Sequence, residues 1–392
     1  MDERTSDRVV IFDTTLRDGE QSAGVCFSRR DKLEIAAALA AMGVDVIEAG
    51  FPGASPAELA AVRAVAQEVR GATICGLARA VPGDVEAAVE ALHGAAHPRI
   101  HVFVNASDRQ LAQQLHKTRE AVLEMTRIAV RQARSGVAEV EFSPMDATRA
   151  DPAFLAELVR AALAAGASTL NLPDTVGFIL PDGLRALIER LYARVPELHD
   201  AVLSFHGQDD LGLATANAIT AVSAGARQLE VTVNGIGERA GNTSLEEVVM
   251  ALRVHGAGLG VHTGVESRGI FGLSKLVEER SGMAVASNKA IVGRNAFRHA
   301  SGIHQDGVLK QRETYEVIDP AEIGHPIGTE IVLGKLSGRA GFAARARALG
   351  FALEGALLQG AFERFQQLAD LKREVGDDDV RRICSSTASA AA

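Results

Sequence analysis

The sequence predicts an α/β protein: a closed (β/α)8 TIM barrel followed by a smaller, mainly helical C-terminal region. Over residues 1–256, eight short apolar segments alternate with segments of helical periodicity, the number of units that such a barrel contains. Polar residues follow nearly every apolar segment, and this regularity favours a closed barrel. A doubly wound open sheet has the same alternation and is the alternative fold.

The predicted strands follow one another at regular intervals. They are Val9–Asp13, Val44–Gly50, Thr73–Leu77, Ile100–Asn105, Glu139–Ser143, Thr169–Leu172, Val202–Phe205 and Gln228–Val233. The predicted helices between them include Asp31–Met42, Ser55–Val69, Asp84–Leu92, Ala153–Ala165, Asp182–Val195 and Leu213–Ala224. Many of these helices begin at Asp, Ser or Pro and end near Gly, as helix caps require.

Polar residues at the strand ends indicate where the active site lies. In a parallel barrel the site is at the carboxyl ends of the strands. The sequence has these residues there: Asp13, Glu48, Arg79, His101, Ser143, Thr175, His206 and Asn234.

Two of these strand ends carry side chains that can bind a divalent metal. The first strand ends at Asp13, and the strand period of two puts Ser204, His206 and Gln208 on one face of the seventh. A carboxylate, an imidazole and an amide oxygen suit a borderline or hard cation with positions open for substrate. The alternative interpretation is a capped strand end and a buried, hydrogen-bonded histidine.

After residue 256 the pattern changes. Gly256–Gly264 (GAGLGVHTG) is predicted to be a glycine-rich linker, and residues 264–381 a second, mainly helical region. This region contains a predicted loop, Arg294–Gln311, and a final helix, Leu353–Lys372. Residues 382–392, which end in CSSTASAAA, are of low complexity and are predicted to be disordered.

The composition excludes several classes of partner. The formal net charge of −9 provides no basic surface for nucleic acid, and the chain has no Trp to stack on bases. No run approaches 18 apolar residues, so no membrane span is expected. Three widely spaced cysteines, Cys26, Cys75 and Cys384, and the absence of an apolar signal segment predict a cytoplasmic protein.

The segment DTTLRDGEQ, residues 13–21, resembles the opening signature of the alkylmalate synthases, which include 2-isopropylmalate, homocitrate and citramalate synthases. Other segments resemble the family, in order, along nearly the whole chain. They include VDVIEAGFPGAS, VEFSPMDATRAD, LNLPDTVG, FHGQDDLGLATAN, VTVNGIGERAGNTSLEEVVMAL and NKAIVGRNAFRHASGIHQDGVLKQRETYE. The amino-acid sequence of the last segment most resembles that of the 2-isopropylmalate synthases.

The resemblance implies an acyltransferase that condenses acetyl-CoA with a 2-oxo acid and then hydrolyses the thioester. The best match is the conversion of 2-oxoisovalerate to 2-isopropylmalate in leucine biosynthesis; homocitrate synthase and a synthase of specialised malates are the alternatives. It also implies a divalent metal ion, Mg²⁺, Mn²⁺ or Zn²⁺, and a homodimer in which the C-terminal region reaches over an active site. Feedback inhibition by leucine is not expected, because a chain of this length does not accommodate the C-terminal leucine-sensing domain of full-length family members.

The resemblance also assigns roles to residues. The implied metal ligands are Asp13, His206, Gln208 and Asn242. The implied catalytic residues are Arg17, which would stabilise the alkoxide, and His304, Asp306 and Tyr315, which would handle protons. The implied oxo-acid pocket consists of Gln21, Leu77, His101, Ser143 and Thr175, although such residues are often ordinary core hydrogen-bonding groups.

Four positions depart from the family pattern. Met145 stands where members usually carry Glu, and a thioether cannot transfer a proton. Glu141, on the same strand face, is the predicted replacement, and Asp146 is the second candidate. The other departures are Gln208 for His, Ala300 for Glu and Leu336 for His. They leave open a catalytically silent, metal-binding regulatory paralogue as the alternative class.

Overall fold

The computed structural model describes residues 7–372 and 374–389, and the chain divides into two compact units, Met1–Val285 and Ala286–Ala392. In the first unit eight parallel strands form a closed barrel in chain order, so the predicted barrel is confirmed. The strands are β2 (Val10–Asp13), β3 (Val46–Gly50), β4 (Thr73–Arg79), β5 (Pro98–Asn105), β6 (Glu139–Met145), β7 (Thr169–Asp174), β8 (Val202–Gly207) and β9 (Gln228–Val231).

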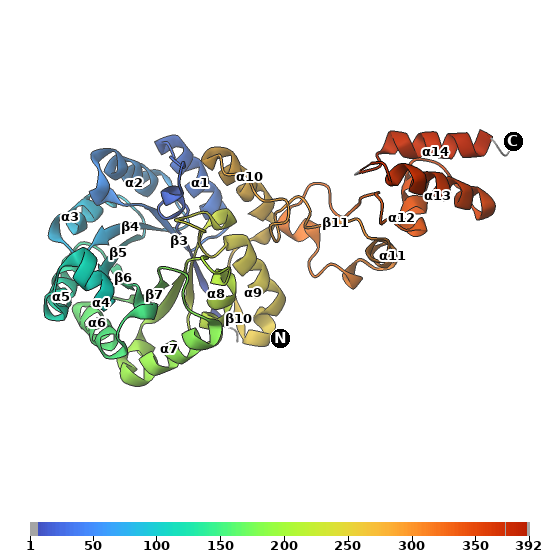
Figure 1. The fold of residues 1–392 in the computed structure, drawn as a ribbon. Helices are drawn as coiled ribbons and strands as arrows, with labels where there is room; N and C mark the ends of the chain where they lie inside the picture. Colours follow the sequence, from blue (N-terminus) through green and yellow to red (C-terminus); the bar gives the residue numbers. More distant parts are fainter. Residues whose placement is uncertain (1–6, 373, 390–392) are drawn as a thin grey trace. The chain divides into compact units, whose positions relative to one another are not determined.

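Helices surround the barrel strands (Figure 1). They are α1 (Arg29–Ala41), α2 (Pro56–Glu68), α3 (Pro82–Ala91), α4 (Asp108–Gln110), α5 (Arg119–Gly136), α6 (Pro152–Ala165), α7 (Pro181–Arg194), α8 (Ala214–Ser223), α9 (Leu245–Leu259) and α10 (Ile270–Ser281). Each predicted helix of the barrel coincides with one of these to within two residues. The caps are as expected: Ser28 Oγ accepts from the Asp31 amide, and Asp31 Oδ2 accepts from the Ser28 amide.

Charged side chains lie inside the barrel. Every residue of β3 and of β7 is buried, because helices cover the outer face of the strands and side chains fill the interior. Glu48, Glu141 and Glu230 project from β3, β6 and β9 and are each at most 2% exposed. The interior below the active-site end is therefore a network of ionised and hydrogen-bonded groups.

The glycine-rich segment Gly256–Gly264 is partly helical, which corrects the expected linker. Helix α9 continues to Leu259 before the chain enters β10 (Val261–His262), which pairs with β1 (Asp7–Arg8). A Cβ on Gly256 would lie 2.5 Å from the Val261 carbonyl oxygen. Glycine here therefore lets the helix end pack against the returning chain.

The second unit is mainly helical. It contains α11 (Gly302–Lys310), α12 (Arg339–Ala348), α13 (Gly355–Ala369) and α14 (Asp377–Ser389), with β11 (Arg298–His299) paired to β12 (Glu330–Ile331). Strand β11 and helix α11 both fall in the segment expected to be a loop. Helix α11 is anchored by the buried Gln305, whose Nε2 donates to the carbonyls of His299 and Val332.

The expected disordered tail is a helix as far as Ser389; Ala390–Ala392 lie outside the described residues. Val380, Ile383 and Cys384 recur at helical spacing and are buried in one cluster with Phe342 and Phe365. Burial of this apolar face stabilises α14 despite the low complexity of its sequence. In the described part of the chain, no helix combines the length and the apolar character needed to cross a membrane.

Candidate active site

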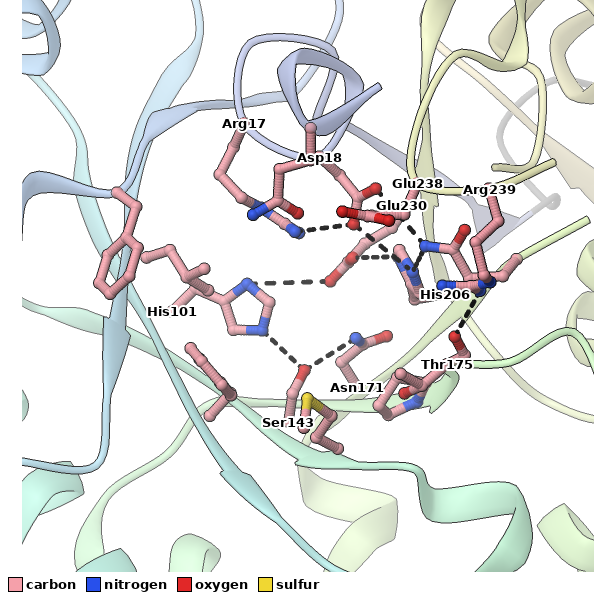
Figure 2. Close-up of a pocket in the computed structure, with 17 residues that line it drawn as sticks. Arg17, Asp18, His101, Ser143, Asn171, Thr175, His206, Glu230, Glu238 and Arg239 are labelled. Carbon is pink, nitrogen blue, oxygen red and sulfur yellow. Dashed lines mark hydrogen bonds and ion pairs between the residues drawn. The ribbon is translucent and has the colours of Figure 1, made fainter. Parts of the chain in front are cut away.

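A cavity of about 230 Å³ opens at the carboxyl ends of the barrel strands. Its lining contains these predicted residues: Arg17, Gln21, Leu77, His101, Ser143, Thr175, His206 and Gln208. Figure 2 shows the labelled side chains converging on this space from several strands. Two polar strand-end residues are engaged elsewhere: Arg79 pairs with Asp84, and Asn234 Nδ2 donates to the Ser274 carbonyl.

Asp13 does not lie in the cavity lining. Its carboxylate is fully buried and accepts hydrogen bonds from the amide and the hydroxyl of Thr15, each at 2.9 Å. Burial raises the pKa of Asp13 to about 7, against the opposing effect of these hydrogen bonds. A carboxylate in this position braces the turn after β2 and has no route to a ligand in the cavity.

Asp18, in the turn that follows β2, lies with the other three predicted ligands. Its carboxylate is 4.0 Å from His206 Nε2 and accepts from Asn242 Nδ2 at 2.8 Å and from Gln208 Nε2 at 3.4 Å. The backbones of Gln208 and Asn242 are joined by an antiparallel bridge, which holds their side chains side by side. The geometry therefore replaces Asp13 by Asp18 as the candidate carboxylate ligand.

The four side chains fit a metal ion. His206 Nδ1 donates to Glu230 Oε2 at 2.8 Å, which leaves Nε2 facing Asp18. Gln208 Oε1 and Asn242 Oδ1 are buried and have no hydrogen-bond partner among the described residues. A bound cation beside Asp18 would explain both unsatisfied oxygens.

Charge keeps Asp18 ionised and Arg17 cationic. Burial alone would raise the pKa of Asp18, but Arg17, whose Nη1 lies 2.7 Å from Asp18 Oδ2, lowers it below its usual value. Burial lowers the pKa of His206, but the hydrogen bond and charge of Glu230, together with the charge of Asp18, outweigh burial, and the net pKa is raised. Burial likewise opposes the charge on Arg17, but the carboxylates of Glu48, Asp18 and Glu230 together outweigh burial and raise its pKa.

A chain of hydrogen bonds runs from Arg17 through Glu48 and His101 to Ser143. Figure 2 shows its last link, between His101 and Ser143. Arg17 Nε donates to Glu48 Oε2 at 2.7 Å, and His101 Nδ1 donates to Glu48 Oε1 at 2.8 Å. His101 Nε2 lies 2.6 Å from Ser143 Oγ. Burial lowers the pKa of His101, but the charge and hydrogen bond of Glu48, together with the charges of Glu230 and Glu141, outweigh burial and raise the pKa to about 9.

The direction of the Ser143 hydroxyl follows from this chain. With His101 charged, its Nε2–H donates to Ser143 Oγ, and Asn171 Nδ2 donates to the same oxygen at 2.9 Å. Both acceptor positions of the hydroxyl are then occupied. The Ser143 hydroxyl hydrogen therefore remains available to an acceptor in the cavity, with an imidazolium behind it.

One wall of the cavity is apolar. Phe51, Leu77, Phe103, Met145 and Pro173 form it. The Met145 side chain is thus in the cavity, at a position where a carboxylate would reach bound substrate. An apolar side chain of a small acid fits against this wall better than a second charged group.

Neither predicted replacement for a carboxylate at position 145 reaches the cavity. Glu141 lies deeper in the barrel, where it accepts from Arg99 Nη1 at 3.2 Å and from Gln228 Nε2 at 2.8 Å. The Asp146 carboxylate is also buried and accepts two hydrogen bonds from Arg149. The alternation of side chains along the strand correctly predicted that Glu141 faces the barrel interior. It could not predict how far Glu141 lies from the carboxyl ends of the strands, where the cavity is.

A second group of possible metal ligands lies between the cavity lining and the barrel interior beneath it. Atoms of His101, Glu141 and Glu230 come within 4.8 Å of one another. However, both nitrogens of His101 are engaged, by Glu48 and by Ser143. This group is better explained as a charge network than as a metal site.

The rim contains two residues that the sequence analysis missed, Glu238 and Arg239. Arg239 forms two hydrogen bonds with Asp210 and donates to the Thr175 carbonyl at 2.9 Å. It thereby ties together the loops after β7, β8 and β9. The GER sequence in a turn was a signal that could have identified both residues.

Three predicted catalytic residues belong to the second unit. The rings of His304 and Tyr315 stack with centroids 4.2 Å apart, and both side chains are exposed. Asp306 pairs with Lys310 one helical turn away. The structure therefore brings the His304 and Tyr315 rings into contact, whereas Asp306 forms an ion pair with Lys310.

Other missed residues are buried polar groups within apolar strands. Glu230 and Asn171 both line the cavity. Glu48, which the sequence analysis named among the polar strand ends but gave no role, lies beneath it. A buried charge needs a partner, so a Glu within a predicted core strand is a usable signal. For Asp18 the signal was its position next to Arg17 in a turn of polar residues.

Comparison with known proteins identifies relatives of both units. The HMGL-like family matches residues 8–277, and the family described as homocitrate synthase post-HMGL domain-like matches residues 291–373. The 2-isopropylmalate synthase of Syntrophus aciditrophicus is 52% identical over 376 residues, which cover 96% of this chain and 73% of that protein. That of Gloeothece citriformis is also 52% identical, over 390 residues, with the same coverage.

Solved structures share the barrel. The hydroxymethylglutaryl-CoA lyase of Pseudomonas aeruginosa has a TM-score of 0.62 at 25% identity and covers 73% of this chain and 97% of its own. The HMG-CoA lyase of Bacillus subtilis has a TM-score of 0.61 at 23% identity, covering 72% and 96%. At this level of identity the likeness concerns the fold.

Proposed function

The chain belongs to the HMGL-like family, among the 2-isopropylmalate synthases, and from this premise we propose that it condenses acetyl-CoA with 2-oxoisovalerate to give 2-isopropylmalate and CoA. The single observation that carries the proposal is the cavity in which Arg17, Asp18, His206 and Gln208 converge beside an apolar wall. The acyltransferase activity is that of the relatives, which are about half identical to this chain over nearly its full length.

The reaction forms one carbon–carbon bond and breaks one thioester bond. A proton leaves the acetyl methyl group, the methyl carbon attacks the keto carbon, and the resulting alkoxide takes a proton. Water then cleaves the thioester and releases CoA. Asp18, His206, Gln208 and Asn242 would hold a divalent cation, which would supply Lewis-acid polarisation of the keto group.

Arg17 and Ser143 are placed to stabilise the alkoxide. Arg17 is fixed by Glu48 and Asp18, so its guanidinium needs no reorganisation when negative charge develops. The Ser143 hydroxyl, backed by charged His101, donates toward the cavity. Both donors favour the transition state over the neutral ketone, which is the requirement for catalysis.

The proton acceptor from the acetyl methyl group is proposed to come from the second unit. His304 is exposed and stacked on Tyr315, and histidine suits proton transfer near neutral pH. With Met145 in the cavity, Glu141 below it and Asp146 paired with Arg149, neither replacement proposed for position 145 is available for this step. We further propose a homodimer in which these two rings serve a partner subunit's barrel, with Asp306 nearby.

The apolar wall supports 2-oxoisovalerate over the dicarboxylic oxo acid that homocitrate synthase uses. Phe51, Leu77, Phe103 and Met145 offer a branched alkyl group a dry surface and offer a second carboxylate no donor. Thr175 and Gln21 complete the pocket near the polar end. The three unpaired cysteines support a reducing, cytoplasmic setting for the reaction.

The test is CoA release from acetyl-CoA with a panel of 2-oxo acids. We expect kcat/KM to be highest for 2-oxoisovalerate, and at least about tenfold lower for 2-oxoglutarate, because a charge on the apolar wall is costly. The Arg17→Ala variant should lose about 10²–10³ in rate. A preference for 2-oxoglutarate would support homocitrate synthesis instead. No release with any oxo acid would support the silent, metal-binding paralogue, for which Met145 is the specific argument.

A further inference from the structure

We infer that Gln208 tunes the metal site toward a hard, six-coordinate cation, Mg²⁺ or Mn²⁺, and lowers its relative affinity for Zn²⁺. The inference rests on the proposed function only in taking Asp18, His206, Gln208 and Asn242 as the ligands. Its test measures binding in the absence of both substrates. A chain without synthase activity would leave it standing, and a fully active chain could still contradict it.

The unpartnered amide oxygens are the first observation. Gln208 is 5% exposed and Asn242 is 3% exposed, so water does not satisfy their side chains. Their nitrogens donate to Asp18 Oδ1, and their oxygens, Gln208 Oε1 and Asn242 Oδ1, accept from no group among the described residues. A half-turn of each amide about its last side-chain bond exchanges its oxygen and nitrogen, and would turn both oxygens toward a cation beside Asp18 and His206. That cation would also balance the carboxylate.

The composition of the donor set is the second observation. Asp18, Gln208 and Asn242 offer oxygen, and only His206 offers nitrogen. Oxygen-rich sets suit Mg²⁺ and Mn²⁺, whereas zinc sites in proteins are built mainly from imidazole and thiolate. Most protein sites bind Zn²⁺ more tightly than Mn²⁺. We therefore express the selectivity of this site as the ratio of its Zn²⁺ and Mn²⁺ affinities, which an oxygen-rich donor set lowers.

Space beside the four ligands is the third observation. The cavity of about 230 Å³ adjoins Asp18, His206 and Gln208 and leaves room for water or for substrate oxygens. Octahedral ions need such further ligands, whereas a structural zinc site closes with four. The bridge between Gln208 and Asn242 fixes both backbones, so a change at position 208 alters the donor with little movement of the others.

The experiment compares metal affinities of the full-length chain stripped of metal. Titration calorimetry with Mn²⁺ and chelator competition with Zn²⁺ give the ratio of the two affinities in wild type and in Gln208→His. We expect one Mn²⁺ per chain in the wild type, and a Zn²⁺/Mn²⁺ affinity ratio that rises at least about tenfold in Gln208→His, since one imidazole replaces one amide oxygen. Gln113→His, which adds an imidazole at an exposed position of the short helix Leu111–Leu115, is the matched control and should leave the ratio unchanged.

A second variant guards against misfolding of the first. Gln208→Glu keeps an oxygen donor and adds charge, so Mn²⁺ and Mg²⁺ affinity should rise while the Zn²⁺/Mn²⁺ ratio stays within about threefold of wild type. Equal ratios in wild type and Gln208→His would overturn the inference. So would the absence of stoichiometric Mn²⁺ binding in the wild type, or a ratio in Gln208→Glu as high as the one expected for Gln208→His.

Discussion

Asp13 and Asp18 are both buried carboxylates close to the end of β2, and their surroundings give them opposite properties. Burial raises the pKa of Asp13 to about 7, and the Thr15 amide and hydroxyl take its oxygens. Arg17 holds the pKa of Asp18 below its usual value, so this carboxylate is charged and faces His206. Charge and access together make Asp18, and not Asp13, the candidate ligand.

The two aspartates give a matched pair of substitutions. Asp18→Asn should lower bound metal to below a tenth of the wild-type content, because the site loses its only anionic ligand. Asp13→Asn should keep the metal, since its amide oxygen can still accept from Thr15. Metal analysis of the three purified proteins checks this. Loss of metal in Asp13→Asn with retention in Asp18→Asn would reverse the assignment.

The charge on His101 gives a prediction about pH. Its folded-state pKa of about 9 exceeds the unfolded value of 6.5. The stability contributed by the charged ring is therefore complete below pH 6.5 and is lost as the pH rises to about 9. The unfolding free energy should fall over that window by up to about 1.4 kcal/mol per pH unit from this residue.

Nitrogen-15 NMR of histidine-labelled protein measures the His101 titration directly, with His101→Gln used to assign the signal. The ring should remain doubly protonated at pH 8. A midpoint at or below 6.5 would mean that Ser143 faces a neutral imidazole, and its hydroxyl would then be free to donate to His101 instead of to the cavity.

A substitution of Glu141 tests whether a residue below the cavity takes part in the reaction. It bonds to Arg99 and Gln228 beneath the cavity, so Glu141→Gln should leave kcat within about threefold of wild type. The same change should lower the unfolding free energy by about 1–3 kcal/mol, because it disturbs buried charged hydrogen bonds. Steady-state kinetics and urea denaturation measure the two effects. A hundredfold loss of kcat with unchanged stability would restore Glu141 as a proton carrier.

At the scale of elements, the strands and the loops that follow them build the site together; His101, Ser143 and His206 lie on β5, β6 and β8. Asp18 and Asn242 lie in turns, and Gln208 follows β8 directly, held to Asn242 by a bridge. Arg239 ties three of these loops together through Asp210 and the Thr175 carbonyl. A loop position such as that of Gln208 can therefore carry a different metal-binding side chain without a change in the barrel strands.

The barrel could be predicted from the sequence because its signals are local. Strand period and helix caps act within a few residues, so β2–β9 and the helices between them follow from the pattern. The choice of Asp18 over Asp13, and the depth of Glu141, depend on how a turn folds back and on which layer of the barrel a residue occupies. Those are tertiary properties, and no spacing in the chain encodes them.

Helix α14 shows the same limit in the second unit. Its composition predicts disorder, whereas packing of Ile383 and its neighbours onto Phe365 stabilises a helix. Ile383→Ala should lower the unfolding free energy of the chain by about 2–5 kcal/mol, as buried Ile truncations do. Arg381→Ala, on the exposed face, should change it by less than about 0.5 kcal/mol. Equal effects in thermal denaturation would mean that α14 does not pack on this core.

At the scale of the whole molecule, the barrel contains the proposed metal ligands, the proposed alkoxide donors and the apolar wall, and the second unit contains His304 and Tyr315. Each unit matches its own family, HMGL-like for residues 8–277 and homocitrate synthase post-HMGL domain-like for residues 291–373. The proposed reaction needs groups from both. Activity therefore depends on the full chain and, by our proposal, on its dimer.

The most direct test of the central claim is product identification in a reaction of acetyl-CoA labelled in the methyl carbon with 2-oxoisovalerate. Mass spectrometry should find labelled 2-isopropylmalate in a one-to-one ratio with released CoA, because each condensation cleaves one thioester. Arg17→Ala should reduce both products together. Release of CoA with labelled acetate and no malate would show a thioesterase, and would contradict the claim that this cavity joins the two substrates.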